Sequence, residues 1–286
     1  MKDQLIKSWQ RIFLDCPGDM DWWTRKMNLM KKRDAEIIKI SGYIRCYRYF
    51  HVPDYICQVE YFLHLAYLIR QYNHYYMEEE IVPIRADFDD GQITNQTMMI
   101  PRPARKSPSL MSPDPSPQND PVSSRRFHYD RRKAVQYAER WWNDYNPAFR
   151  NFEVDCTNYV SQCMLAGNAP MRGYPNRSRG WWYKHDNWSY SWSVAHALRW
   201  YLSSSEQGLT AREVDKANQL SPGDVICYDF EGDGKWNHNT IVVARDANGE
   251  PLVNAHTVNS RHRYWSYEDS HAWTPECQYK FFKIGE

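Results

Sequence analysis

The sequence lacks long apolar stretches. Its longest strongly apolar run without a charged residue, Tyr61 to Ile69, is interrupted by His64 and is far shorter than the roughly 20 residues that a membrane-spanning helix needs. The amino terminus, MKDQLIKSWQRIFLDCPGD, also lacks the apolar core and small-residue cleavage site of a secretory signal. We therefore expect a cytoplasmic protein that does not insert into membranes.

The chain also lacks an excess of either charge. It has 36 Lys and Arg against 35 Asp and Glu, for a formal net charge of +1. A general nucleic-acid binder needs a net basic surface to neutralise phosphates, so this function class is excluded.

A paired cysteine motif is missing as well. The seven cysteines are an odd number without a C-x-x-C pair, which argues against a disulfide framework and a structural zinc site. Reduced thiols are expected, and one of them can be a nucleophile. The cysteines are Cys16, Cys46, Cys57, Cys156, Cys163, Cys227 and Cys277.

The run Asp229–Gly234 is similar to the start of a calcium loop, but Thr240 stands where the bidentate Glu should be. We expect a polar turn there, with no metal and no cofactor.

Aromatic residues are abundant instead. They make up 15% of the 286 residues, with 13 Trp and 21 Tyr, although the mean hydropathy is −0.81. Seven of the 16 prolines fall between Pro101 and Pro121, a composition that is typical of an extended linker. We therefore predict an accessory domain over residues 1–100, a linker over 101–124 that can also dock a protein partner, and a second domain over 125–286.

The first domain is predicted to be a small α+β domain in which a helix packs on an antiparallel sheet, with a cystatin-like arrangement as one form of it. Leu5, Trp9, Ile12 and Phe13 form one helical stripe, and a second helix is expected near Trp22–Lys32. Period-two alternation predicts the strands, with Asp89-Asp90-Gly91 as a hairpin turn. The expected strands are residues 37–50, 55–69, 75–88 and 92–99. The acidic run Glu78–Glu80 is expected on a solvated strand face, and the domain is assigned only a docking or regulatory role.

The second domain is also predicted to be α+β, with helices before an antiparallel set of strands. Helices are expected over residues 130–145, from Cys156 to Gly167, and from the serines at 189–193 to Leu202. Strands are expected over residues 225–230, 238–245, 252–258 and 278–284.

Cys156 is the strongest candidate for chemistry in this domain. It follows Asp155 at the predicted start of a helix, where free N–H groups and the helix dipole stabilise a thiolate and lower its pKa. The alternative is a small buried apolar residue, a description that fits Cys163 better.

A predicted hairpin with an Asn248-Gly249 turn supplies the candidate bases. His238 opens its first strand, while Asn254 and His256 share a face of the second. Counting from the turn places His256 opposite Ile241 and Asn254 opposite Val243. An imidazole and a polar group that orients it are what a cysteine nucleophile needs.

The residues from Ala134 to about His256 resemble the putative amidase domain family, which is found largely in spore-forming bacteria and is similar to the papain-like NlpC-type and CHAP amidases and peptidases. The motifs that carry the resemblance are YNPAF (145–149), DCTNYVSQCMLAG (155–167), RGWWY (179–183), YSWSV (190–194), PGDVICYDFEGDGKWNH (222–238) and NAHT (254–257).

The resemblance implies a papain-like second domain and a role for each matching residue. Cys156 would be the nucleophile, His238 the general base and His256 the third member, with Asn254 as the alternative. The oxyanion would be met by the Cys156 backbone N–H and a side-chain donor. Candidates for oxyanion or substrate contacts are Tyr145, Asn158, Trp181 and Trp182.

The implied function is a cysteine-dependent amidase or peptidase that cleaves a peptide-type amide through a thioester, with peptides from peptidoglycan fragments as the expected substrate class. An acyl or peptidyl transferase and a non-enzymatic peptide- or glycan-binding module are the alternatives. Because the expected substrate comes from the cell wall, release from the cell or association with spores is the alternative to a cytoplasmic location.

Overall fold

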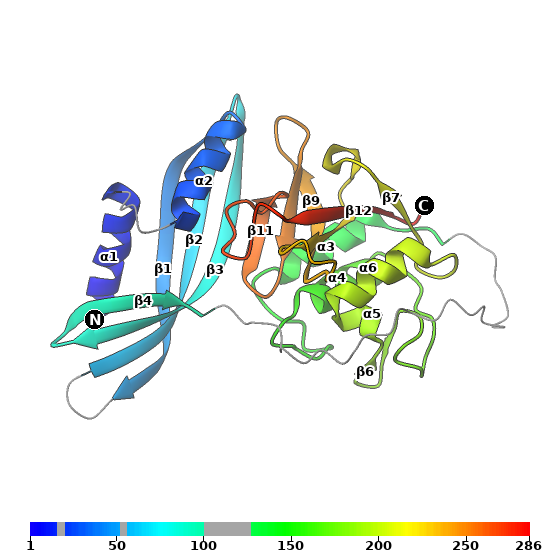
Figure 1. The fold of residues 1–286 in the computed structure, drawn as a ribbon, viewed down its shortest axis with the longest axis horizontal. Coiled ribbons are helices and arrows are strands. Elements are labelled where there is room, and N and C mark those ends of the chain that lie inside the picture. The colour runs from blue at the N-terminus through cyan, green and yellow to red at the C-terminus, as the bar shows by residue number, and fades with distance from the viewer. Residues whose placement is uncertain (16–20, 52–55, 100–126) are drawn as a thin grey trace. The chain divides into compact units, whose positions relative to one another are not determined.

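The computed structural model describes residues 1–15, 21–51, 56–99 and 127–286 (Figure 1). The predicted proline-rich linker lies outside these residues. The chain forms two compact units. Unit 1 comprises Met1–Pro101, Val258–Ser260 and Tyr267–His271, and unit 2 comprises Arg102–Thr257, Arg261–Ser266 and Ala272–Glu286. Two segments near the carboxyl terminus therefore belong with the first unit, which the linear division at the prolines does not foresee.

Unit 1 consists of two helices and an antiparallel meander, as its sequence predicts. The chain forms α1 (Lys2–Asp15), α2 (Asp21–Lys32), β1 (Ala35–His51), β2 (Ile56–Gln71), β3 (His74–Asp89) and β4 (Gln92–Met98), and each strand pairs with the next. Both helices lie against the sheet (Figure 1). Alternate β2 side chains, from Val59 to Ile69, are buried beneath them, which is the pattern of a strand with one face in the core.

A buried ion-pair cluster lies in unit 1. Lys26 of α2 is fully buried, and its Nζ lies 2.5 Å from Glu78 Oε1, 2.9 Å from Asp269 Oδ2 and 4.5 Å from the centre of the Tyr67 ring. Tyr67 in turn donates its hydroxyl proton to Glu80. The prediction of a solvated acidic strand face was therefore wrong for Glu78 and Glu80, because a buried ammonium and a phenol compensate their burial.

Unit 2 places its main helices on one side of a sheet. Its helices are α3 (Arg131–Trp141), α4 (Cys156–Ala166), α5 (Tyr190–Ser193), α6 (Ala195–Ser204) and the 3-10 turn η1 (Ala217–Gln219). The prediction that the first helix reaches Tyr145 was wrong, since α3 ends at Trp141. The predicted third helix is divided in two because Val194 has extended backbone angles.

The strands of unit 2 are antiparallel. They are β7 (Ala211–Val214), β8 (Val225–Asp229), β9 (His238–Arg245), β10 (Pro251–Ala255), β12 (Gln278–Ile284) and the part of β11 (Asn259–Tyr264) from residue 261 onward. Their order is β11–β10–β9–β8–β12–β7. A separate hairpin joins β5 (Tyr183–Lys184) to β6 (Asn187–Trp188). The α+β class is confirmed, while β5, β6, β7 and β11 were not predicted.

The register of the β9–β10 hairpin differs from the prediction. Asn254 lies opposite Ile241, and not opposite Val243, with an irregularity between Leu252 and Val253. The connection is a five-residue loop in which the Asp246 carboxylate accepts the backbone N–H groups of Asn248 and Glu250. The longer loop and the irregularity together shift the pairing.

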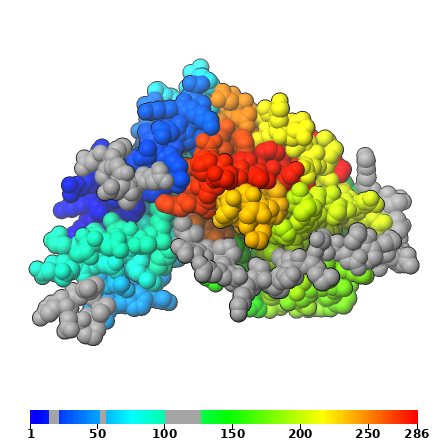
Figure 2. Space-filling view, viewed as in Figure 1, coloured from blue at the N-terminus to red at the C-terminus, as the bar shows by residue number. Residues whose placement is uncertain are grey.

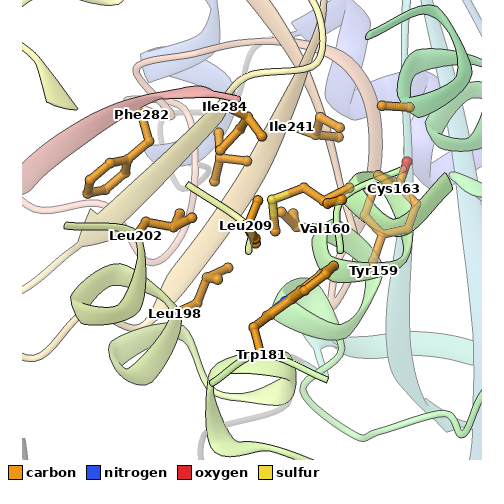
Figure 3. Packing of buried hydrophobic residues seen from close by; sticks show 14 of the residues in the cluster. Tyr159, Val160, Cys163, Trp181, Leu198, Leu202, Leu209, Ile241, Phe282 and Ile284 are labelled. Atoms are coloured by element: carbon orange, nitrogen blue, oxygen red, sulfur yellow. The ribbon is translucent and has the colours of Figure 1, made fainter. Parts of the chain in front are cut away.

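The core of unit 2 lies between α3, α4 and α6 and the sheet. Figure 3 shows Tyr159, Val160 and Cys163 of α4 packed near Leu198 and Leu202 of α6 and near strand residues Ile241, Phe282 and Ile284. No described helix is long and apolar enough to cross a membrane.

Candidate active site

Cys156 is the first residue of α4, and Thr257 caps the helix at this point. The Thr257 hydroxyl accepts the backbone N–H groups of Asp155 (3.1 Å) and Cys156 (3.3 Å). The Asp155 carboxylate accepts the backbone N–H of Phe152 and the side-chain amide of Asn158. The start of α4 is therefore fixed by the side chains of Asp155 and Asn158 at the helix start and by that of Thr257, which follows β10.

The Cys156 thiol is buried, with 1% of its surface exposed. Burial raises its pKa above the usual value, although the backbone N–H of Asn239 and the hydroxyls of Thr157 and Thr257 stabilise the thiolate and oppose that rise. The prediction of a lowered pKa was therefore wrong, because the loss of hydration outweighs the three donors.

The other buried cysteines have more apolar surroundings. Burial raises the pKa of Cys163 well above its usual value, and it also raises that of Cys227. Cys163 packs among the core residues of α4 (Figure 3), which agrees with its predicted structural role. The six described cysteines are free thiols, and Cys156 is the one among these six that lies at a helix start.

The face of β9 that carries Asn239 packs against α4. The Asn239 side chain donates to the Thr157 hydroxyl at 2.9 Å. Cys227 lies opposite Asn239 on β8 and belongs to the core formed with α4. Because successive strand residues point to opposite faces, the imidazole of His238 projects from the other face of the sheet.

His238 is accordingly surrounded by different groups. Its ring lies 5.6 Å from the ring of Tyr228 and 5.8 Å from that of Phe230, and it is 8% exposed. Burial, and to a smaller extent the charge of Arg263, lowers its pKa to about 3, so it is neutral at physiological pH. The structure does not bring this imidazole to the Cys156 thiol.

His256 lies on the same face of the sheet as Asn239. It follows Asn254 by two residues, and Asn254 pairs with Ile241. His256 Nδ1 is 2.8 Å from Asp155 Oδ2, and Nε2 is 2.7 Å from the carbonyl oxygen of Trp141. Both oxygens accept, so both contacts are hydrogen bonds only when each ring nitrogen carries a proton.

The His256 ring also stacks on Tyr159, with 4.0 Å between ring centres, and meets the edge of Tyr145 at 5.0 Å. It thereby joins the end of α3 to the start of α4 and the end of β10. In this conformation its nitrogens hold the scaffold and do not contact the thiol or His238.

Asn254, the alternative third member, is engaged elsewhere. Its amide donates to Glu139 at 3.0 Å, and its oxygen accepts the backbone N–H of His262 at 2.9 Å. Burial raises the pKa of Glu139, but hydrogen bonds and charges from His262 and Arg261 outweigh it and lower the pKa to about 2. Asn254 therefore belongs to a polar cluster that joins β10 to α3.

Three of the four predicted oxyanion and substrate residues are buried, namely Asn158, Trp181 and Trp182. Asn158 donates to the carbonyl oxygen of Arg150 and to Asp155, and it accepts the Trp192 indole N–H. Trp181 and Trp182 are 0% and 1% exposed and lie in the interior, not at a surface that a substrate can reach. Tyr145, at 37% exposure, is the accessible member of this set.

Sequence reasoning missed Thr257, Thr157 and Asn239 as neighbours of the thiol. Thr157 follows Cys156 in the DCTNYVSQCMLAG motif, and Thr257 follows His256 in the NAHT motif. Their position next to a candidate catalytic residue could have identified them as neighbours of the thiol. Asn239 follows His238 in the same way, and its backbone N–H reaches the sulfur.

The Asp229–Gly234 run is a polar turn at the surface, yellow-orange in Figure 2. The Asp229 carboxylate accepts the backbone N–H groups of Gly232, Asp233 and Gly234. Within the described ranges, no group of three or more His, Cys, Asp or Glu side chains is placed to hold a metal ion.

Comparison with known proteins identifies the family of the region that contains this site. A family model described as "Putative amidase domain" matches residues 128–282, which include α4 and the whole β8–β10 region. The chain belongs to this family. The putative amidase domain thus accounts for more than half of the chain, and its family indicates a hydrolase that acts on amides.

Two proteins that are similar to this member of the putative amidase domain family come from Bacillus subtilis (strain 168). "Uncharacterized protein YhbB" is 46% identical over 270 residues, which cover 93% of this chain and 87% of that protein. "Uncharacterized protein YjcM" is 29% identical over 140 residues, which cover 46% of this chain and 31% of that protein. No solved structure matches the chain.

Proposed function

We propose that the protein is a cysteine-dependent amidase that cleaves a peptide-type amide with Cys156 as its nucleophile, on a scaffold related to the papain-like NlpC-type and CHAP enzymes. The observation that supports the proposal best is the set of three donors around the sulfur at the start of α4. Donors at a helix start stabilise a thiolate. Cys163, inside the helix, has the Tyr159 hydroxyl and a backbone group beside it, and the described surroundings of Cys227 supply no such donor.

In the proposed reaction, the Cys156 thiol gives its proton to a histidine and the sulfur attacks the carbonyl carbon of the amide. The tetrahedral intermediate collapses as the C–N bond breaks, and the histidine returns the proton to the leaving amine. Water then attacks the thioester, the same histidine takes its proton, and the C–S bond breaks to release the acid and restore the thiol.

His238 is the proposed base. The amide nitrogen of Asn239, which donates to the sulfur, is bonded to the carbonyl carbon of His238, so the backbone of His238 passes beside the thiol. A backbone rearrangement at the start of β9 that turns His238 over would bring its imidazole toward the sulfur, because side-chain rotation alone would leave the ring on the other face of the sheet. It would also remove part of the burial that lowers its pKa to about 3, and thereby make it a stronger base.

His256 is proposed to position the nucleophile. Its hydrogen bond to Asp155 holds the residue that precedes Cys156 and so fixes the start of α4. This assigns a supporting role to the predicted third member. Peptides derived from peptidoglycan are the proposed substrate class, as the resemblance to the NlpC-type enzymes implies.

The decisive experiment compares Cys156→Ala with Cys163→Ala, a matched change on the same helix. Wild type and both variants are incubated with muropeptides and with simple acyl-amides, and products are read by mass spectrometry. Cys156→Ala is expected to lose cleavage by about a thousandfold or more, as the loss of a nucleophile does in other hydrolases, while folded Cys163→Ala keeps it.

The proposal is overturned if no substrate is cleaved in a Cys156-dependent manner, or if folded Cys163→Ala loses as much activity. Circular dichroism of each variant shows whether it is folded. Adding a primary amine separates hydrolysis from transfer, because a transferase would give the amide of the added amine in place of the free acid.

A further inference from the structure

A short aromatic hairpin lies beside the start of α4. In the β5–β6 pair, Tyr183 lies opposite Trp188, and the two linking residues, His185 and Asp186, have φ angles of 51° and 53°. Positive φ at both positions is typical of the tight type I′ turn, which matches the twist of the strands. The rings of Tyr183 and Trp188 are stacked, with 6.2 Å between ring centres. The hairpin therefore presents Trp188 in a fixed orientation.

The segment that precedes α4 joins this hairpin to the candidate nucleophile. The ring of Phe152 meets that of Trp188 edge-on at 4.9 Å, and its backbone N–H donates to the carboxylate of Asp155 at 3.0 Å. The carbonyl oxygen of Arg150 accepts the side-chain amide of Asn158 at 2.9 Å. Trp188 is thus connected to the first turn of α4 through residues in direct contact.

Two guanidinium groups surround the Trp188 ring. The central carbon of Arg177 lies 5.0 Å from the ring centre, and that of Arg150 lies 5.3 Å from it. The Arg177 side chain is fixed further by a hydrogen bond from Nε to the carbonyl oxygen of Trp188 at 3.0 Å. Both arginines are exposed, so their outer nitrogens are accessible to a ligand.

Acidic groups compensate this positive charge only weakly. Asp186 approaches Arg150 at 3.9 Å, with both side chains more than half exposed, and such a pair contributes little. In the described part of the chain, no carboxylate lies within ion-pair distance of Arg177. The cation of Lys184, 4.9 Å from the ring centre of Tyr174, is on the same hairpin. The surface beside α4 is therefore cationic, on a chain whose net charge is only +1.

We propose that Arg177 and Arg150, held on the Trp188 ring, bind a carboxylate of the peptide whose amide Cys156 attacks. A guanidinium donates two parallel N–H bonds to a carboxylate, and the aromatic surface beside it accommodates the adjacent peptide carbons. The inference rests on the proposed function, and it adds that the enzyme selects substrates with a free acid near the cleaved bond.

Binding is tested on the full chain with Cys156→Ala, so that no ligand is consumed. The probes are an N-acetylated alanine tetrapeptide with a free carboxyl terminus and the same peptide as a carboxamide. Affinity is measured by NMR titration of the indole N–H signals, with Trp188 assigned through Trp188→Phe. The free acid is expected to bind about three to ten times more tightly than the carboxamide and to shift the Trp188 signal.

Two further variants have opposite expected effects. Arg177→Gln should abolish the preference for the acid, whereas Asp186→Asn should strengthen binding of the acid because it removes the competing carboxylate from Arg150. Equal affinity for the two peptides would overturn the inference, as would an undiminished preference in the double variant Arg150→Gln, Arg177→Gln.

Failure of the proposed function has a different signature. If wild type cleaves nothing in a Cys156-dependent manner but the acid preference is present and depends on Arg177, the cationic surface binds carboxylates and the amidase assignment fails. If cleavage is present without any acid preference, the surface does not select the substrate.

Discussion

The two faces of strand β9 have different environments, although the residues that define them are neighbours in the sequence. The face toward α4 is polar at its end, where Asn239 donates to Thr157, and His256 on the same face is bonded to Asp155. The opposite face buries His238 between aromatic rings. The helix start, the capping hydroxyls and the hydrogen bond between His256 and Asp155 are all on one side, and His238 is on the other.

This difference shows how a strand can separate two residue types that a catalytic site needs. Alternation along β9 keeps the imidazole of His238 away from the sulfur, while the backbone between His238 and Asn239 touches it. In the proposed mechanism, a rearrangement at the start of β9 would have to bring the imidazole to the sulfur before the site can react. Three predictions test the contrast between the two faces.

The largest expected effect concerns the polar face. Asp155→Ala leaves the buried His256 imidazole and the N–H groups of Phe152 and Asn158 without this acceptor. At about 1–3 kcal/mol for each unsatisfied group, the variant should lose about 3–5 kcal/mol of unfolding free energy. The control is Asp130→Ala, since Asp130 precedes α3 in the same way but is only half-buried, and its carboxylate meets the backbone N–H and, at 3.5 Å, the ammonium of Lys133. It should cost about 1 kcal/mol. Urea unfolding of the full chain measures both. Equal losses would show that His256 does not hold the polar face together.

A smaller effect is expected from the aromatic face, and it depends on pH. Burial holds the pKa of His238 at about 3 in the folded protein, against about 6.5 in the unfolded chain. The unfolded chain therefore binds a proton that the folded protein does not, and stability falls as the pH drops from about 6.5 to about 3. The slope is about 1.4 kcal/mol per pH unit.

His238→Gln should remove this slope, which urea unfolding of wild type and variant at pH 7, 6, 5 and 4 would reveal. Both proteins lose other contributions with acid, so the comparison is between their slopes and not between their absolute stabilities. Parallel curves for the two proteins would contradict the burial of a neutral imidazole.

The smallest expected effect distinguishes the donors at the sulfur. Thr257→Val keeps the branched shape but removes the hydroxyl that stabilises the Cys156 thiolate. One hydrogen bond is worth about 1 kcal/mol, so the rate at which iodoacetamide labels Cys156 should fall about fivefold near neutral pH. Thr257→Ser should restore the rate. Mass spectrometry of the labelled peptides gives both values, and a faster reaction in Thr257→Val would mean that burial, and not the loss of a donor, controls the thiol.

The sequence contained enough information to predict most elements of unit 1. Its long strands have one buried face, so residues such as Tyr61, Leu63 and Leu65 follow a strict period of two. The burial of Glu78 could not be foreseen in the same way. It depends on Lys26 and, through that ammonium, on Asp269, which are 52 and 191 residues away along the chain, and no local pattern connects them.

In unit 2 the helix that starts at Cys156 was predicted correctly. The helical spacing of Tyr159, Val160 and Cys163 indicated it, and Gly167 marked its end. The side of the sheet on which each histidine lies was not predicted. That depends on a register, and the Asn248-Gly249 pair suggested a two-residue turn where the structure has a five-residue loop. Trp181 and Trp182 were misplaced for another reason, since composition does not distinguish a groove from a core.

The segment Tyr267–His271 has a consequence for the order in which the protein is made. Asp269 supplies the second carboxylate to the buried Lys26 of α2, and 243 residues separate the two. At about 5–20 residues per second, a ribosome needs roughly 12 to 50 seconds to make that stretch. During this time the amino-terminal unit contains Lys26 without one of its two carboxylate partners. Its final packing therefore has to wait until almost the whole chain has been synthesised, so the unit that is translated first is among the last parts to be completed.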